Sequence, residues 1–463
     1  MRKLLIILAL CCLIGSAMAA DTLINPNRIN LSKNWNGQMH NVTNGTGAQD
    51  VMTVSQGWNK INKSDSTTAY NTSSFDAYIF KSGNIIYSYY RNGSLIHSGT
   101  NLTDDNHVIN VTRDYVYVAS AGRGGTIGIG PGRFLISWTI LNTDIPGKIR
   151  YIGAGRGWIW QGSTVFYAER DTTMMKFYGS ASGADATMYA NPYVQGIYFD
   201  GAEYNVTAIN VTNCLHARIT DNAFQDCASS ALVVKNSYDV EIDRNLFNAC
   251  GDPNEAVVLL TRQGAGGSDV NTDVKFHDNV MEPSYYSFVD STYTPNGMYY
   301  DNYLEAATFH GAILPTYGIV ISSGSERSIV SRNEIGIASS QADGIAIYIN
   351  VADCTVSQNK IFGWVDHGSG KHGIYNTGAV YTIITGNSVY GMSDTGISFG
   401  GTYGLITSNQ VRGNHYGIKE VGGADYNVIS GNVAHGNVDG QITQTGANDV
   451  PASAGIGTQN IAA

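Results

Sequence analysis

The sequence has 463 residues, of which 14% are charged, and its formal net charge is −10. An acidic chain without a basic cluster argues against a nucleic-acid partner, because such partners are held by lysines and arginines along the phosphate backbone. The chain has 54 Gly, 29 Tyr and only 9 Pro, a composition typical of β-structure with many turns.

The first nineteen residues form a predicted signal peptide. Arg2 and Lys3 give a basic start, residues 4–14 are apolar, and residues 17–19 (Ala-Met-Ala) form a small-x-small cleavage site. The alternative is an N-terminal membrane anchor, for which the apolar run is short. No later segment is apolar enough to span a bilayer, so we expect a secreted or cell-surface protein with no membrane span after signal cleavage.

Residues 20–130 are predicted to be β-rich and carry most of the Asn-x-Ser/Thr sequons of the chain. Asn- and Thr-rich composition would also generate such triplets, but none occurs after residue 210, which favours true glycosylation of an exported protein. The predicted glycosylation sites are Asn30, Asn41, Asn44, Asn62, Asn71, Asn92, Asn101, Asn110, Asn205 and Asn210.

A repeat of the form apolar-x-x-Asn-x-apolar runs through the second half of the chain. A second element, Gly-Ile-x-Ile or a variant, precedes several of these asparagines, as at Gly318, Gly344, Gly373, Gly396 and Gly417. Each repeat of about 22 residues therefore holds three short strands, which indicates a solenoid. The asparagines of the repeat are Asn222, Asn245, Asn279, Asn302, Asn333, Asn359, Asn387, Asn409 and Asn432.

The predicted fold is all-β, a right-handed parallel β-helix over residues 131–445 followed by a tail at 446–463. Leucine-rich repeats share the period but need a Leu-x-x-Leu-x-Leu frame, and propeller blades need about 40 residues. Coils of a β-helix stack at about 4.8 Å. We expect the asparagines to form a column in one turn, each in the left-handed conformation and each bonding its neighbours through its amide.

Four cysteines remain after the signal peptide, and two of them are predicted to form a disulfide. Cys227 and Cys250 each lie five residues after the asparagine of their coil. Stacked coils would bring their Cα atoms within disulfide range, and export permits oxidation. The alternative is a buried, unlinked pair. Cys214 and Cys354 have no evident partner.

The chain resembles the pectin lyase-like superfamily of right-handed β-helices. The resemblance rests on Pro131-Gly-Arg-Phe-Leu-Ile136, Ile152-Gly-Ala-Gly155 and Gly196-Ile-Tyr-Phe-Asp-Gly201, and it covers about two-thirds of the chain. It implies a fold shared by polysaccharide lyases, hydrolases, epimerases, tailspikes and adhesins, and it does not choose among them.

Known catalytic signatures of that superfamily match only in fragments. Of the polygalacturonase motifs, Asn271-Thr-Asp273 is present, Lys371-His-Gly373 is the nearest to Gly-His-Gly, and Arg-Ile-Lys is absent. Trp364-Val-Asp-His367 is similar to the Trp-Ile-Asp-His of pectate lyases but lies late in the chain. Copper-delivery β-helix proteins share the Gly-Ile repeat, yet no Met, His and Cys cluster suits copper.

Candidate site residues follow from the superfamily, whose sites lie along the first strand of each coil. The residues just before the Gly of that strand are Tyr317, Asp343, His372, Thr395, Tyr416 and Asp439. Asp343 and His372 are expected one coil apart, near enough for a carboxylate–imidazole pair. The predicted catalytic residues are Asp343, His372, Asp366 and Asp394, and the predicted substrate-binding residues are Tyr375, Lys419, His415, Trp364 and His367.

The function expected from these features is binding or processing of an extracellular polysaccharide or cell-surface glycan, with lyase or glycosidase chemistry if the protein is an enzyme. Aromatic rings suit sugar rings, and acid and base groups suit glycan cleavage. The alternative is a structural surface protein or adhesin without turnover. Calcium is the one cofactor that we consider, and no metal site is assigned.

Overall fold

The structure is a computed structural model that describes residues 41–43, 49–51, 75–143, 148–157, 162–179, 189–252, 254–263, 270–282, 287–305, 317–337, 344–363, 371–449 and 461–462. Contacts divide the chain into two units, residues 1–72 and 73–463. In the first, strands β1 (Asn41–Thr43) and β2 (Gln49–Val51) pair antiparallel.

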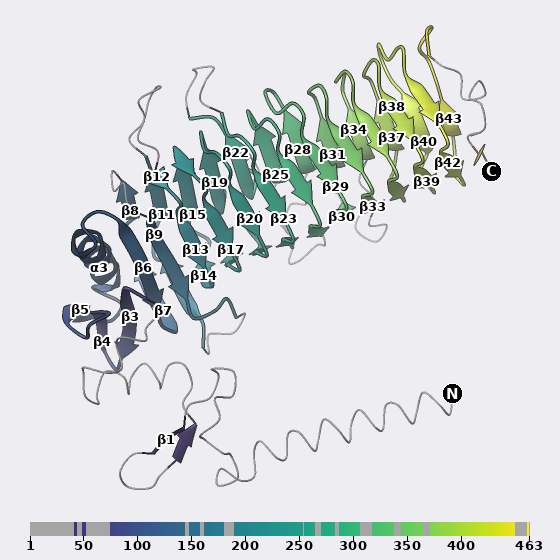
Figure 1. Ribbon diagram of the computed structural model, residues 1–463. Helices are drawn as coiled ribbons and strands as arrows, with labels where there is room; N and C mark the ends of the chain where they lie inside the picture. Colours follow the sequence, from purple (N-terminus) through teal and green to yellow (C-terminus); the bar gives the residue numbers. More distant parts are fainter. Residues whose placement is uncertain are drawn as a thin grey trace, which may run out of the picture. The chain divides into compact units, whose positions relative to one another are not determined.

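The second unit is a stack of coils, and each coil contributes one strand to each of three long sheets (Figure 1). We number the sheets in the order in which a coil visits them. Sheet 1 contains β8 (Ile140–Thr143), β11 (Thr172–Tyr178), β15 (Val206–Thr212), β19 (Leu232–Lys235), β22 (Val258–Thr261), β25 (Ser287–Thr292), β28 (Tyr317–Ser322), β31 (Ile345–Ile349), β34 (His372–Asn376), β37 (Thr395–Phe399), β40 (Tyr416–Glu420) and β43 (Gly440–Thr443).

Sheet 2 follows sheet 1 in each coil, and at its N-terminal edge it also contains an antiparallel meander. Its members are β3 (Ala77–Ser82), β4 (Ile85–Tyr90), β5 (Leu95–Thr100), β6 (Gly124–Ile129), β9 (Lys148–Gly153), β13 (Tyr193–Gln195), β17 (Arg218–Thr220), β20 (Glu241–Asp243), β23 (Lys275–His277), β26 (Met298–Tyr300), β29 (Ile329–Ser331), β32 (Thr355–Ser357), β35 (Ile383–Thr385), β38 (Leu405–Thr407) and β41 (Val428–Ser430).

Sheet 3 closes each coil. It contains β7 (Gly132–Ile136), β10 (Thr164–Ala168), β14 (Ile197–Asp200), β18 (Ala223–Gln225), β21 (Leu246–Asn248), β24 (Val280–Met281), β27 (Tyr303–Glu305), β30 (Glu334–Ile337), β33 (Lys360–Gly363), β36 (Ser388–Tyr390), β39 (Gln410–Arg412), β42 (Val433–His435) and β44 (Ile461–Ala462). A further short pair, β12 (Tyr189–Ala190) and β16 (Cys214–Leu215), is also parallel. Apart from the meander, the coil strands pair in parallel, which confirms the predicted parallel β-helix.

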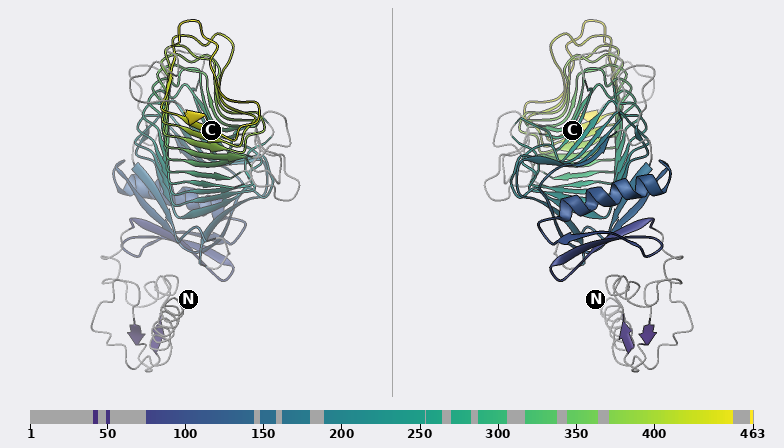
Figure 2. Two further views of the ribbon diagram at one scale, coloured as in Figure 1. Left: turned by 90° about the vertical axis from the view of Figure 1, so that its right-hand side faces the viewer. Right: turned by 90° about the vertical axis from the view of Figure 1, so that its left-hand side faces the viewer.

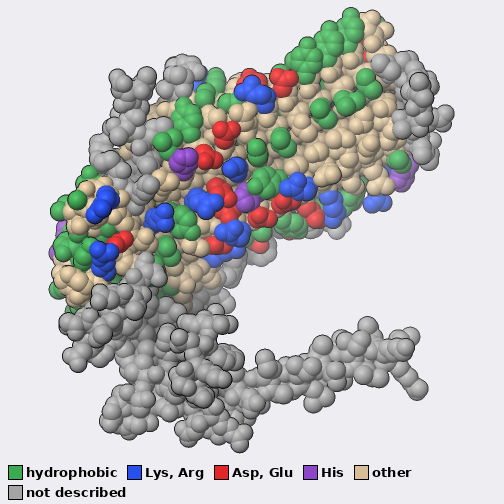
Figure 3. Space-filling model, in the orientation of Figure 1, with side chains coloured by type: hydrophobic (Ala, Val, Ile, Leu, Met, Phe, Trp, Pro, Cys, Tyr) green, Lys and Arg blue, Asp and Glu red, His purple; other side chains and the backbone are tan. Residues whose placement is uncertain are grey.

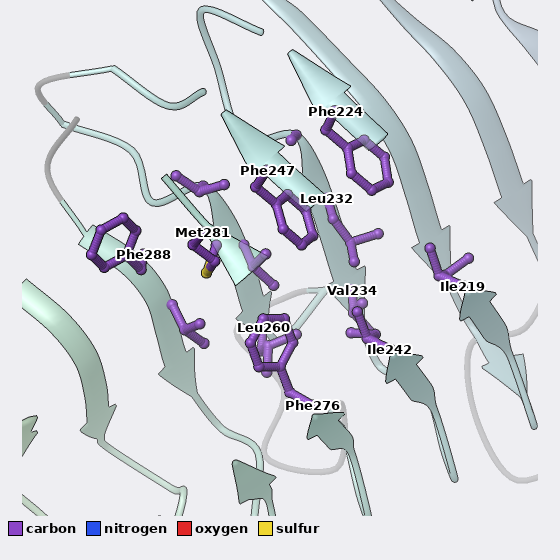
Figure 4. Close-up of a cluster of buried hydrophobic side chains, with 14 of the residues drawn as sticks. Ile219, Phe224, Leu232, Val234, Ile242, Phe247, Leu260, Phe276, Met281 and Phe288 are labelled. Carbon is purple, nitrogen blue, oxygen red and sulfur yellow. The ribbon is translucent and has the colours of Figure 1, made fainter. Parts of the chain in front are cut away.

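Apolar columns from the three sheets fill the interior of the stack (Figure 4). On sheet 3 the inward column is aromatic in the early coils, where Phe224 and Phe247 stack with ring centroids 4.7 Å apart. In later coils the same column contains Val411 and Ala434, both fully buried. Period-2 alternation within each short strand places these residues inside, and the hydrophobic effect holds the coils together.

The predicted asparagine column lies in the turn between sheets 2 and 3, and its nine side chains are at most 2% exposed. In the first eight, the side-chain nitrogen donates to the next asparagine and to a main-chain carbonyl of the preceding coil, and in Asn432 it donates to the Ile406 carbonyl. For Asn333 these two bonds are 2.9 Å to Asn359 Oδ1 and 2.9 Å to the Tyr299 carbonyl. The Asn333 Oδ1 accepts from the main-chain and side-chain nitrogens of Asn302. Every polar atom of the amide is therefore satisfied without water.

The predicted backbone conformation of these asparagines is wrong by one residue. The left-handed conformation belongs to the residue that precedes each asparagine, for example Arg244 with φ 52° and Gln358 with φ 57°. The asparagine itself follows the turn, where its side chain can point into the stack. Asn is therefore favoured at this position because its side chain forms hydrogen bonds in the turn, not because it tolerates positive φ.

The N-terminal end of the coil stack is covered by a helix that the sequence analysis did not anticipate. Helix α3 (Asp105–Ala119) lies within the region expected to be β-rich and runs across the end of the stack (Figure 2). It buries Val108, Ile109 and Val116, a spacing that places them on one helical face. The parallel ladder itself already includes β6 and β3, upstream of residue 131.

Such a cap shields the first coil's apolar interior, much as terminal repeats do in other solenoids. A buried ion pair fastens it, with Lys81 Nζ 2.6 Å from Asp105 Oδ2. Among the residues that the structure describes, no helix is long and apolar enough to cross a membrane.

Candidate functional site

The outer face of sheet 1 carries a row of aromatic rings on successive coils, which we call the ring row: Tyr317, Tyr348, Tyr375 and His372. The centroids of Tyr317 and Tyr348 are 5.7 Å apart, and those of Tyr348 and Tyr375 are 6.0 Å apart. His372 stacks on Tyr375 at 4.7 Å with an interplanar angle of 18°. His372 is buried and the three tyrosines are partly exposed.

The turn that leads into sheet 1 carries polar side chains on four successive coils, which we call the turn column: Lys371, Asp394, His415 and Asp439. The main-chain N–H of Asp394 donates to the Lys371 carbonyl, and that of Asp439 donates to the His415 carbonyl. His415 Nδ1 lies 3.1 Å from Asp439 Oδ2. The main-chain N–H of Tyr416 donates to the Asp394 carbonyl, so the predicted residues Asp394 and His415 lie on adjacent coils at the edge of the predicted strand.

Two other predicted binding residues lie on the same face. Tyr375 of β34 pairs with Ser398 of β37, which pairs with Lys419 of β40. The Lys419 ammonium lies 3.7 Å from the centroid of the Tyr416 ring, a cation–π contact. Tyr375 and Lys419 are therefore two coils apart in one outward column.

The expected alignment of Gly344 with Gly373 differs from the observed register of sheet 1, whereas the pair of Asp343 and His372 stays a prediction because Asp343 lies outside the described residues. In sheet 1 the residue that pairs with His372 is Ile345, so Ala346 takes the place assigned to Gly344. Gly440 likewise takes the place assigned to Asp439, since it pairs with Tyr416. The first difference is a shift of two residues, which keeps the inward and outward alternation, so periodicity alone cannot detect it. The second is a shift of one residue.

Four of the predicted site residues lie outside the described residues: Asp343, Trp364, Asp366 and His367. So do the side chains of five predicted glycosylation sites, Asn30, Asn41, Asn44, Asn62 and Asn71. The other sequon asparagines are exposed or partly exposed on the second unit: Asn92, Asn101, Asn110, Asn205 and Asn210. Glycosylation stays a prediction.

Asp290 is a site candidate that sequence reasoning missed. It points outward from β25 in the same column as Val320 and Tyr348. Burial raises the pKa of its carboxyl above the usual value, although a hydrogen bond from Thr292 acts in the opposite direction. No Gly-Ile pair marks this strand, whose sequence is Ser-Phe-Val-Asp-Ser-Thr. Only the register of neighbouring coils reveals the position of Asp290.

Comparisons with known proteins bear on this geometry. Residues 267–450, less than half of the chain, match the family model described as "Periplasmic copper-binding protein (NosD)". A variant of DFA-IIIase from Arthrobacter chlorophenolicus A6 in complex with DFA-III is similar at a TM-score of 0.52 and 13% identity, covering 72% of this chain and 92% of that one. No curated protein matches the sequence.

Two further solved structures are similar at lower TM-scores. An alginate lyase from Paenibacillus sp. str. FPU-7 has a TM-score of 0.46 and 13% identity, covering 60% of this chain and 92% of that one. The mannuronan C-5 epimerase AlgE6 A-module from Azotobacter vinelandii has a TM-score of 0.43 and 14% identity, covering 75% and 93%. This chain has the pectin lyase-like, right-handed parallel β-helix fold.

One group of side chains in the described part of this β-helix could hold a metal ion, and it lies on sheet 2: Glu241, Asp243 and His277. His277 Nε2 is 3.4 Å from Glu241 Oε1, and its Nδ1 is 2.8 Å from Asp278 Oδ2. Three ligands with an oriented imidazole would suit zinc.

The protein's own cations already neutralise that group. Arg218 pairs with Glu241, and Arg244 pairs with Asp243. Burial alone would raise the pKa of Glu241, but bonds from Arg218 and His277 outweigh burial and lower it. A dication would have to displace both arginines, so we assign no metal to this β-helix at this position.

The four cysteines of the β-helix, Cys214, Cys227, Cys250 and Cys354, are buried and have free thiols in this structure. Cys227 and Cys250 each lie two residues beyond a register pair, Gln225 and Asn248, on adjacent coils. The interaction with Cys250, together with burial, raises the pKa of the Cys227 thiol far above its usual value. The stacking therefore agrees with the expected geometry, and the disulfide itself stays a prediction.

Proposed function

We propose that this protein is exported and binds a polysaccharide along the outer face of sheet 1. The observation that carries the proposal is the ring row, which presents aromatic side chains on consecutive coils at spacings near 6 Å. Tyr rings offer apolar faces and a polar tip, the combination that sugar rings require. A chain of sugars would lie across the coils, along the axis of the stack.

The turn column supplies acid and base groups beside this binding face. Asp394 and Asp439 are two coils apart, so their backbones are separated by about 10 Å at the usual strand spacing. That is near the upper limit for an inverting glycosidase. Lys371 and His372 border the same edge and could serve as bases in a lyase reaction. The second candidate function is therefore cleavage of the bound glycan at this edge.

A glycan array of acidic and neutral polysaccharides tests binding. We expect wild-type protein to bind at least one glycan and Tyr375→Ala to bind it at least severalfold more weakly. Tyr303→Ala removes a partly exposed tyrosine on sheet 3 and should bind like wild type. Failure of wild type to bind any glycan, or equal losses in both variants, would refute the sheet 1 site.

Turnover is measured on the glycans that bind, by reducing ends for hydrolysis and by unsaturated product for elimination. Asp394→Asn should abolish product while leaving binding within about twofold, since the amide of Asn has almost the same shape as the carboxylate but carries no charge. Binding without any product would support the alternative of a non-catalytic surface protein or adhesin.

A further inference from the structure

A three-by-three array of outward side chains lies on sheet 2 in the last coils. Each of the three coils reads Tyr-x-aliphatic-Ile-Thr or Ser: residues 381–385, 403–407 and 426–430. The Ile at the fourth place is buried in every case, so the first, third and fifth side chains share the outer face. The nine members, which we call the tyrosine array, are Tyr381, Ile383, Thr385, Tyr403, Leu405, Thr407, Tyr426, Val428 and Ser430.

The register within the tyrosine array is regular. Ile383 pairs with Leu405, which pairs with Val428, and Thr385 pairs with Thr407 in the same strands. The tyrosine rings stack with centroids 5.4 Å and 5.0 Å apart and interplanar angles of 21° and 12°. The array thus repeats the same three chemical groups once per coil.

The tyrosines of the array are exposed, and nothing in the described part of the structure covers them. Tyr381 is 55% exposed, Tyr403 is 52% and Tyr426 is 48%, and the aliphatic column beside them is also partly open. None of the nine side chains is charged, and Figure 3 shows the surface over these coils as mostly green and tan. Three exposed rings beside aliphatic groups exceed what a solvated surface needs.

Backbone conformation shows that the tyrosines are not the easiest residues for these places. Their φ angles are 55°, 56° and 57°, in the left-handed region. The equivalent position in earlier coils is also left-handed, and its occupants are His216, Asp239, Asp273, Asn296, Arg327 and Asp353, four of which are Asp or Asn. Asp and Asn adopt this conformation more readily than an aromatic residue does. The ring must therefore be kept for what its side chain does, because strain of this kind marks functional positions.

We propose that the tyrosine array is a second binding surface, for an extended, uncharged polysaccharide chain that lies along the stack with about one sugar per coil. The aliphatic column would support the C–H face of the sugars, and the phenol and threonine hydroxyls on its two sides would bond their hydroxyl groups. Uncharged lining matches an uncharged ligand. The carboxylate of Asp425, next to Tyr426 in the sequence, is already held by the main-chain and side-chain nitrogens of Asn448, each at 2.8 Å.

The test is a pull-down of full-length protein with microcrystalline cellulose, chitin and a soluble neutral glucan, with alginate as an acidic comparison. Replacing Tyr403 by glycine removes the ring and also relieves the left-handed strain. We expect Tyr403→Gly to weaken binding to the neutral glycan between about twofold and tenfold, the share of one aromatic contact. The triple variant with Gly at 381, 403 and 426 should not bind it detectably.

Asp353→Gly is the matched control, because it changes the same backbone position one coil earlier, where no ring is present. Asp353→Gly should bind the neutral glycan like wild type, and so should Tyr303→Ala on sheet 3, which lies on neither of the two proposed surfaces. The melting temperature should change little in Tyr403→Gly, whereas a purely structural ring stack predicts a clear fall.

Three results would overturn the proposal. The first is retention of no neutral glycan by the wild type, and the second is unchanged binding in the triple variant. The third is a wild-type dimer in sedimentation that becomes monomeric in Tyr403→Gly, since the occupant would then be a second copy of this chain.

Discussion

Two stretches of sheet 2 have the same strand pairing and differ in the charge of their outward side chains. Strands β17, β20 and β23 present Arg218, Glu241 and Lys275, while β35, β38 and β41 present Ile383, Leu405 and Val428 in the same column. Most charged side chains in Figure 3 gather over the earlier coils. We call the coils that contain β17, β20, β23, β26 and β29 the charged half, and the coils that contain β35, β38 and β41 the uncharged half.

The difference shows that in this fold the turns and the interior are fixed by the coil, whereas the outer columns are free to vary. Arg244 and Asp221 pair at 3.0 Å across two coils of the charged half. In the uncharged half, tyrosine rings stack between adjacent coils instead. A solenoid can therefore carry one surface chemistry for a few coils and then change it without altering the fold.

The strongest test of this comparison is that the asparagine column should matter equally in both halves. Asn245→Ala and Asn409→Ala each remove an amide that accepts from two nitrogens of the preceding asparagine. Two buried donors lose their acceptor, so each variant should lose about 4 kcal/mol of unfolding free energy. Chemical denaturation measures both losses.

A matched control is Gln410→Ala, an exposed side chain next to Asn409, which should change stability by less than about 0.5 kcal/mol. A difference above about 2 kcal/mol between the two asparagine variants would contradict the view that the coil backbone is equivalent in the two halves.

The next largest effect concerns the charged half alone, which contains Cys227 and Cys250. Under oxidising conditions we expect them to form a disulfide that closes a short loop and adds about 3 kcal/mol. Thiol titration of the denatured mature protein should then find two reactive thiols, with Cys214 and Cys354 accounting for both. Four reactive thiols after oxidation would show that the pair stays unlinked.

The smallest effect separates the two halves by their response to salt. Arg332 pairs with Asp301 at 2.8 Å on the surface of the charged half. Arg332→Ala should cost at most about 1 kcal/mol, and this cost should shrink in 1 M salt because exposed ion pairs are screened. Tyr403→Gly carries no charge change, so its small effect on stability should not depend on salt.

If both variants respond equally to salt in thermal melts, the charged half owes nothing measurable to its ion pairs. On sheet 1, burial raises the pKa of the Asp290 carboxyl, and no ion pair is among the causes of this shift.

Much of the fold could be predicted because its determinants are local and repeated. Each asparagine is flanked by apolar residues of two strands, and nine repetitions make such a pattern readable without a structure. The helix α3 was missed because a single helix has no repetition, and its apolar spacing lies in a Tyr- and Asn-rich context. Of the candidate site, Asp394, His415 and Tyr375 could be placed beside sheet 1 from the sequence, since they lie next to regular Gly-Ile strands, and their roles stay predictions.

The sequence by itself determined the asparagine column, the three strands per coil and the stacking of Cys227 on Cys250. Only the tertiary structure decided that Ile345 pairs with His372, and that Ala346 takes the place assigned to Gly344, because a two-residue shift leaves the alternation of a strand unchanged. It alone brought Asp290 into line with Tyr348, and it alone showed that Tyr381, Tyr403 and Tyr426 stack in a left-handed turn. Contacts between coils join residues more than twenty positions apart, and their register is set by packing.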